Sequence, residues 1–152
     1  MINSGLFTSN KDDWETPQTL FNKLDKEFNF TIDLCANKIN HKKDRYYSIS
    51  DSTFKHSWDN EIGFLNPPYG RDIDRFIKKA YESKGIIVCL IPSRTDTKYW
   101  HNYVMKAKEI RFIKGRLKFE DHGFPSNPAP FPSAIVVFDG IDHNPTISSY
   151  EV

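Results

Sequence analysis

Four consecutive residues, Asn66, Pro67, Pro68 and Tyr69, follow the short apolar run IGFL and carry groups suited to holding a flat amine. Each Pro fixes its own φ and lacks an N–H, and the residue before a Pro is pushed to extended geometry. The backbone here is therefore stiff, and its carbonyls are free to accept hydrogen bonds. Asn66 adds a side-chain carbonyl, and Tyr69 adds a ring that can stack. Such a set suits a planar molecule with an amino group, for example a nucleobase.

The reaction that such a site favours is methyl transfer to an exocyclic amine. The nitrogen of this amine is a poor nucleophile, because its lone pair is delocalised into the ring. Acceptors that hold both of its N–H bonds favour the charge that develops on nitrogen as the methyl group arrives. A tight turn that merely ends a strand uses the same residue types, and this simpler interpretation stands beside the catalytic one.

The elements that must position these residues follow from periodicity. Thr16 can cap a helix with Pro17 at its first position, and apolar residues then recur at helical spacing, so we expect a helix over 17–27. We expect strands at 30–34, 62–65, 85–91, 109–119 and 133–138, further helices at 71–84 and 96–108, and mostly loops over 38–60. This alternation indicates an α/β domain with a mostly parallel sheet, whose ligands bind at the carboxyl ends of the strands. Residues 33–37 and 66–70 should meet there.

Composition limits the possible classes of protein. The chain has 152 residues, enough for one domain, and its formal net charge of +1 means that nucleic acid must be bound by local patches. No apolar run is long enough to span a membrane. The two cysteines indicate reduced thiols in a cytoplasmic protein, and no His or Cys spacing indicates a metal site. We expect a flexible arm at 1–13, the domain at 14–140 and a tail at 141–152.

The string NPPY after an apolar strand resembles the catalytic motif of the S-adenosylmethionine-dependent amino-methyltransferases, which act on adenine, cytosine, guanine in RNA or glutamine. Further segments occur in the order seen in the small phage-type DNA N6-adenine methyltransferases. They are WETPQTLFNKLDKEFNFTIDLCAN, LNPPYG, LIPSRTDTKYWH, RFIKGRLKF and APFPSAIVVF. The resemblance covers residues 14–138. It implies a single Rossmann-like methyltransferase domain, with helices on both sheet faces, that methylates adenine N6 in DNA from S-adenosylmethionine.

This resemblance also implies cofactor contacts. Glu15, Thr16 and Pro17 match the segment that holds the methionine end, and free N–H groups at a helix start favour a carboxylate; an ordinary helix cap explains Thr16 equally well. Asp33 matches an acidic residue that meets the ammonium or ribose hydroxyls. Asp51 matches an Asp that accepts from the cofactor's adenine, although it also suits a polar turn. The other expected cofactor contacts are Trp14, Cys35, Ala36, Asn37 and Asn66.

Expected DNA contacts follow later strands. Ser93, Arg94 and Asp96 either line the substrate pocket or, for Asp96, cap the next helix. Residues 106–131 interleave basic and aromatic side chains, which suits phosphates and splayed bases, while a solvated strand face is the alternative for single lysines. The contacts that we expect are Arg71, Ser93, Arg94, Asp96 and Arg116, and the run 41–47 offers a second phosphate contact.

The length of the chain leaves no room for a separate target-recognition domain, so we expect a short recognition sequence read by loops. Two other classes of function stay open on sequence grounds. One is an amino-methyltransferase that acts on RNA or protein glutamine. The other is a protein that keeps the fold and binds cofactor or DNA without turnover, as a regulator.

Overall fold

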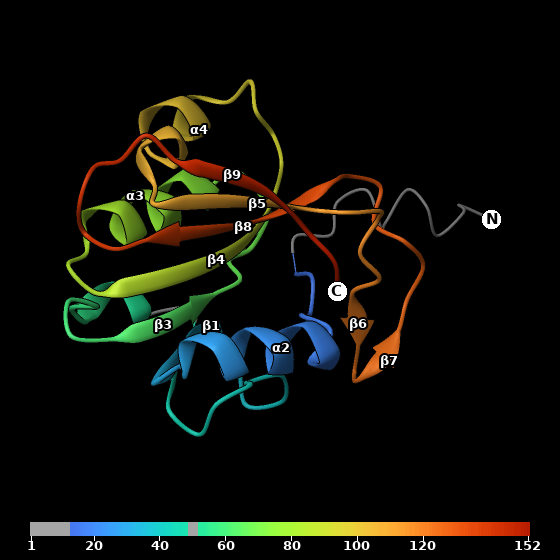
Figure 1. Ribbon diagram of the computed structural model, residues 1–152. Coiled ribbons are helices and arrows are strands. Elements are labelled where there is room, and N and C mark those ends of the chain that lie inside the picture. The colour runs from blue at the N-terminus through green and yellow to red at the C-terminus, as the bar shows by residue number, and fades with distance from the viewer. Residues whose placement is uncertain (1–12, 49–51) are drawn as a thin grey trace.

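The core of the fold is a seven-stranded sheet (Figure 1). The structure is a computed structural model, which describes residues 13–48 and 52–152. The strand order is β2-β1-β3-β4-β8-β5-β9, and β6 and β7 form a separate hairpin. The strands are β1 (Ile32–Ala36), β2 (Tyr46–Ser48), β3 (Ile62–Leu65), β4 (Ile86–Pro92), β5 (Glu109–Ile113), β6 (Glu120–Asp121), β7 (Phe124–Pro125), β8 (Ser133–Phe138) and β9 (Thr146–Tyr150).

The strand directions bring the candidate site to one edge of this sheet. Parallel pairing joins β2 to β1, β1 to β3, β3 to β4, and β5 to β9. Strand β8 lies antiparallel between β4 and β5, so the other six strands share one direction. The expected mostly parallel α/β sheet is confirmed, and the carboxyl ends of β1 and β3 lie side by side.

Helices cover both faces of the sheet, with α2 (Gln18–Phe28) on one side and α3 (Ile73–Glu82) and α4 (Lys98–Asn102) on the other (Figure 1). The ring of Phe21 on α2 lies 5.2 Å from the ring of Phe64 on β3, edge to face. Because both faces are covered, all five residues of β1 are buried, which explains its near-continuous apolar sequence.

Several elements differ from the expectations. The stretch 141–152, expected to be a tail, contains β9, which pairs with β5 over Glu109–Ile113. The strand expected over 109–119 ends at Ile113, because Gly115 turns the chain with φ 76°. The helix expected over 96–108 splits into α4 and the 3-10 helix η2 (Val104–Lys106). The loop region holds β2 and a 3-10 turn, η1 (Thr53–Lys55).

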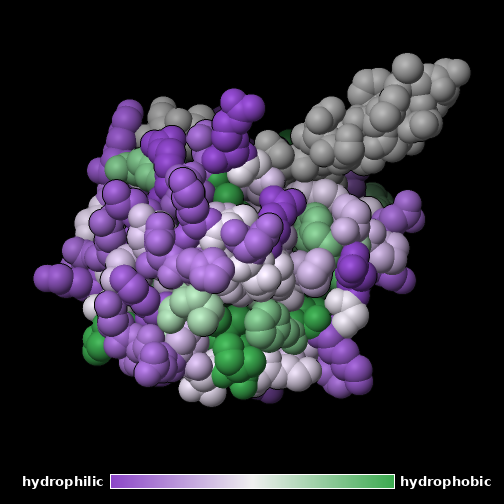
Figure 2. Space-filling view, turned by 90° about the horizontal axis from the view of Figure 1, so that it is seen from above, coloured by the Kyte–Doolittle hydropathy of each residue, from purple (hydrophilic) through white to green (hydrophobic). Residues whose placement is uncertain are grey.

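Polar residues cover most of the face that is turned toward the viewer in Figure 2. Figure 2 shows one face, on which hydrophilic residues dominate and apolar residues form small patches. Among the described residues, no helix is both long enough and apolar enough to cross a bilayer. Cys35 and Cys89 are buried free thiols, and burial raises the pKa of both.

Candidate active site

A cavity of about 550 Å³ opens at the carboxyl ends of β1 and β3. Seven of the residues expected at the cofactor site line it: Trp14, Glu15, Thr16, Asp33, Cys35, Asn37 and Asn66. Pro67 and Pro68, expected as catalytic residues together with Asn66, line it as well. The structure thus joins three segments that are far apart in the sequence, namely the one before α2 and those that follow β1 and β3. This volume lies within the range of small-ligand and cofactor sites.

Asn66 is held by hydrogen bonds on both sides of its amide. Its Nδ2 donates to the carbonyl of Trp14 at 2.5 Å and to Thr16 Oγ1 at 2.9 Å. These two bonds fix the orientation of the amide, so its Oδ1 faces the hydroxyl of Tyr69. Thr16 therefore holds the catalytic candidate and does not cap α2, which has no side-chain cap and begins at Gln18 instead of Pro17.

Tyr69 lies behind Asn66 and does not line the cavity. Its hydroxyl is 2.5 Å from Asn66 Oδ1 and 2.9 Å from the carbonyl of Leu90. Burial raises the pKa of this hydroxyl well above its ordinary value, so it stays protonated, and its one proton can go to only one of the two oxygens at a time. The ring packs edge to face against Phe119 and Phe131, and the residue is 3% exposed.

Asp33 supplies a buried carboxylate to the cavity wall. Its Oδ1 accepts from the backbone N–H of Cys35 at 3.3 Å and its Oδ2 from that of Lys42 at 3.0 Å. Burial raises the pKa of Asp33 to about 6, and these hydrogen bonds only partly offset that effect. A cation placed in the cavity would favour the ionised form of this carboxylate.

Part of the β6–β7 hairpin, which sequence reasoning missed, also lines the cavity. Glu120, Asp121 and His122 line the cavity there. Glu120 Oε2 accepts from the backbone N–H of Gln18 at 3.0 Å, and its Oε1 lies 3.8 Å from Lys42 Nζ. Glu120 therefore takes the place of a side-chain cap at the start of α2. The available local signal for this hairpin was Gly123, a residue type that suits a tight two-residue turn.

The cavity is acidic. Five carboxylate residues line it, against one lysine: Asp13, Glu15, Asp33, Glu120 and Asp121, with Lys42. These carboxylate acceptors suit a ligand that carries positive charge together with hydroxyl and amino donors. Among the described residues, no group of three or more His, Cys, Asp and Glu could hold a metal ion.

Some expected residues lie elsewhere. Pro17 and Ala36 are buried beside the cavity without lining it, and Asp51 falls outside the described residues. Of the run 41–47, Lys42, Lys43 and Arg45 pair with Glu120, Asp25 and Glu61, so these three cations are engaged in ion pairs. Asp96 is exposed, and Thr97 caps α4 in its place by accepting from the N–H of Trp100.

The residues expected to contact DNA do not line the cavity. Arg71, Arg94 and Arg116 are exposed and follow β3, β4 and β5 at the same edge. Arg94 Nη1 lies 3.4 Å from the carbonyl of Tyr69, and Arg116 Nη1 lies 3.5 Å from that of Ala129. Ser93 Oγ is buried and has no hydrogen-bond partner within the described part of the chain.

An open α/β sheet with an acidic cavity at its strand ends, and an Asn-Pro-Pro-Tyr turn in the cavity wall, defines a methyltransferase of the amino-group class. Comparison with known proteins is more specific. The family model described as DNA N-6-adenine-methyltransferase (Dam) matches residues 3–150, and the chain belongs to this family. A DNA N-6-adenine-methyltransferase of Haemophilus phage HP1 is 28% identical over 147 residues, which cover 91% of this chain and 85% of the relative. The protein is a DNA N6-adenine methyltransferase.

Proposed function

We propose that this DNA N6-adenine methyltransferase binds S-adenosylmethionine in the cavity at the strand ends and presents adenine to it at Asn66. The observation that carries the proposal is that Asn66, Thr16 and Asp33 line one cavity although they come from three separate segments. Membership of the Dam family supports the same cofactor.

The lining residues suit this cofactor in charge as well as in size. S-adenosylmethionine, when bound, supplies a methyl group on a positively charged sulfur and also carries an ammonium group. Burial disfavours the ionised form of the Asp33 carboxylate. The positively charged cofactor gives this carboxylate a cationic partner. Glu15 and Thr16 lie before the start of α2, where they contact the methionine end, and Asn37 accepts from the ribose.

Asn66 Oδ1 and the Pro67 carbonyl accept the two N–H bonds of the adenine amine. In the free protein, Asn66 Oδ1 already accepts from Tyr69, so the incoming amine replaces the Tyr69 hydroxyl there. Tyr69 keeps the Leu90 carbonyl as its second acceptor. Stacking of the Tyr69 ring on the base requires the ring to leave its contacts with Phe119 and Phe131.

The DNA backbone lies across the three exposed arginines that follow β3, β4 and β5: Arg71, Arg94 and Arg116. Phosphate contacts position a duplex without reading its sequence, so base choice falls to the neighbouring loops at 93–97 and 119–132. The phage HP1 relative supports a phage or prophage origin for this protein.

Calorimetric titration with S-adenosylmethionine tests the cofactor assignment. We expect the wild-type protein to bind and Asp33→Asn to bind at least tenfold more weakly at pH 7, since one charge pair is worth about 1.4 kcal/mol or more at a buried site. Asp44→Asn is the matched control, because Asp44 is exposed and lies outside the cavity lining. Equal affinity in all three proteins would contradict the assignment.

A further inference from the structure

In the described part of the chain, strand β9 forms one edge of the sheet and lacks the features that protect an edge from further pairing (Figure 1). Its five residues, TISSY, include no charged residue and no Pro, and their register with β5 is continuous. Natural sheets protect their edges with charges, Pro, bulges or very short strands. The strand at the other edge, β2, has three residues and follows Arg45. Of the two edges, β9 is the open one.

The backbone of β9 turns alternate residues toward β5. The Thr146 N–H donates to a carbonyl next to β5 at 3.1 Å, and the Tyr150 carbonyl accepts from an N–H at the other end of β5 at 2.9 Å. Because successive residues of a strand direct their backbone groups to opposite sides, those of Ile147 and Ser149 point to the outer side. The next outward carbonyl, that of Glu151, already accepts a hydrogen bond from α2. Ile147 and Ser149 are therefore the residues that a further strand would meet.

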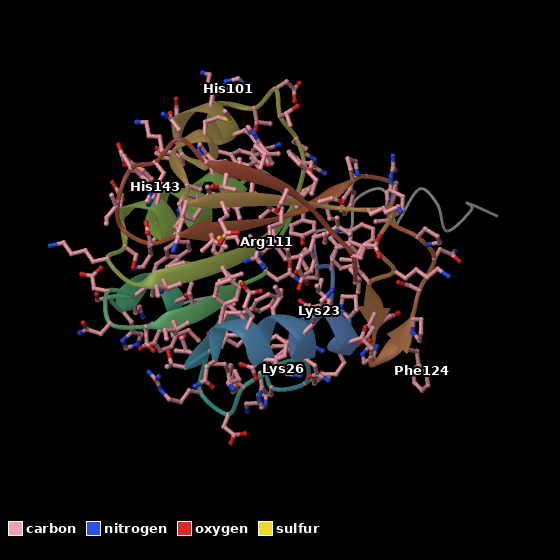
Figure 3. The ribbon with its side chains drawn as sticks, in the orientation of Figure 1. Lys23, Lys26, His101, Arg111, Phe124 and His143 are labelled. Atoms are coloured by element: carbon pink, nitrogen blue, oxygen red, sulfur yellow. The ribbon has the colours of Figure 1, made fainter. Side chains whose placement is uncertain are left out.

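The side chains of β9 hold the strand in place on one face and leave the other face open. On the face toward α2, Lys23 Nζ lies 4.5 Å and the Arg111 guanidinium 5.6 Å from the centre of the Tyr150 ring (Figure 3). On the other face, the Ile147 side chain is 56% exposed. Val152, two residues beyond β9, is 53% exposed. Apolar contacts that covered these two side chains would add to any pairing of the backbone.

A second copy of β9 is complementary to this edge. Antiparallel pairing about a two-fold axis at Ser148 places Ile147 of each copy opposite Ser149 of the other. These are the residues whose backbone groups point outward, so each N–H meets a carbonyl across the axis. Like charges directly opposite each other would oppose such self-pairing, and β9 carries none. The same register brings Glu151 to the start of β9 in the second copy, beside Lys108, so that opposite charges meet there.

We propose that two copies of this chain pair through β9 and join their sheets into one continuous sheet across a two-fold axis. A pair of five-residue strands buries less surface than the roughly 1,200 Å² at which standard protein interfaces begin, so this dimer is weak and depends on protein concentration. Four strands separate β9 from β1, so pairing leaves the cavity of each copy open to cofactor and DNA. The dimer does not depend on the proposed roles of the cavity residues.

Sedimentation velocity tests the dimer and its register. Wild type should pass from monomer to dimer between about 1 μM and 1 mM, the range of weak interfaces. Ile147→Lys with Ser149→Lys places like charges opposite each other and should stay monomeric, whereas Ile147→Lys with Ser149→Glu places opposite charges there and should form a dimer that added salt weakens. Asn60→Lys with Asn102→Lys is the charge control, at exposed positions outside β9, and should behave as wild type. A wild type that stays monomeric, or equal behaviour of the two β9 variants, would overturn the proposal.

Amide hydrogen exchange, followed by NMR in dilute and in concentrated protein, locates the interface. The amides of Ile147 and Ser149 should exchange quickly in dilute protein and become protected in concentrated protein. The Thr146 amide, which is bonded to the β5 side, should be protected at both concentrations and reports that β9 is folded. In the variant with two lysines, Thr146 should stay protected while Ser149 loses its dependence on concentration. Fast exchange of Ile147 and Ser149 at a concentration where wild type sediments as a dimer would show that the copies pair elsewhere.

Discussion

Both polar atoms of the Asn66 side-chain amide form hydrogen bonds in the free protein. Both of its amide donor bonds are satisfied, by the Trp14 carbonyl and by Thr16, while its acceptor oxygen faces the Tyr69 hydroxyl. The two donor bonds orient the amide, and in the proposed function the adenine amine replaces the Tyr69 hydroxyl at Asn66 Oδ1. The proposed function gives Tyr69 two separable roles: its hydroxyl competes with the adenine amine, and its ring, buried in the free protein, stacks on the base.

Substitutions at Tyr69 should separate these two parts. Tyr69→Phe keeps the ring and removes the competing hydroxyl, so methylation of DNA should stay within about threefold of wild type. Tyr69→Ala removes the ring, and loss of stacking worth about 1–3 kcal/mol should lower kcat/KM about 5- to 150-fold. Cofactor affinity and the unfolding temperature of each variant serve as controls for folding. Equal activity of the two variants would contradict a stacking role.

Asp33 should couple stability to pH. Burial raises the pKa of Asp33 from its ordinary 3.8 to about 6, so the folded protein binds this proton more tightly than the unfolded chain. Its contribution to the free energy of unfolding is therefore most favourable below pH 4 and falls as pH rises through 6, by up to about 3 kcal/mol. Asp33→Asn lacks this titration.

Urea unfolding of cofactor-free protein at pH 4 and pH 7 measures the effect. Relative to wild type, Asp33→Asn should gain stability between the two pH values. A difference between the proteins that is the same at both pH values would show that Asp33 has an ordinary pKa.

At the scale of elements, the β6–β7 hairpin closes the site by reaching back to the start of α2. Glu120→Ala removes both the acceptor for the Gln18 N–H and the partner of Lys42, and loss of a helix cap costs about 0.5–2 kcal/mol. Glu120→Gln keeps an acceptor oxygen and removes the charge, so it should lie between wild type and Glu120→Ala in free energy of unfolding. Urea denaturation ranks the three, and equal stability of all of them would rule out the anchoring role.

The elements also show what the sequence can predict. The segments Asp33–Asn37 and Asn66–Tyr69 were placed together correctly, because parallel strands leave their carboxyl ends at one edge. The role of Glu120 was not foreseen, because its partner Gln18 lies 102 positions away and only tertiary packing joins them. Asp96 and Thr97 are both good helix caps by type, and geometry alone selects Thr97.

For the molecule as a whole, the alternation of strands and helices sufficed to predict a mostly parallel α/β domain. It did not place β9, since the sequence TISSY is short and largely exposed and gains its strand geometry from parallel pairing with β5. The sheet therefore extends to Tyr150, and the family match reaches the same residue. One edge of this sheet carries the cavity, with Asn66 in its wall, and the exposed arginines.

The most direct test of the account is nucleoside mass spectrometry of unmethylated DNA after incubation with S-adenosylmethionine and the protein. Wild type should produce N6-methyladenine, without N4-methylcytosine, and Asn66→Ala should be about 100- to 1000-fold slower, the usual loss for one group that stabilises transition-state charge. The control Asn60→Ala changes an exposed residue outside the cavity lining and should match wild type. Methylation by Asn66→Ala at the wild-type rate would contradict the central claim that Asn66 receives the adenine amine.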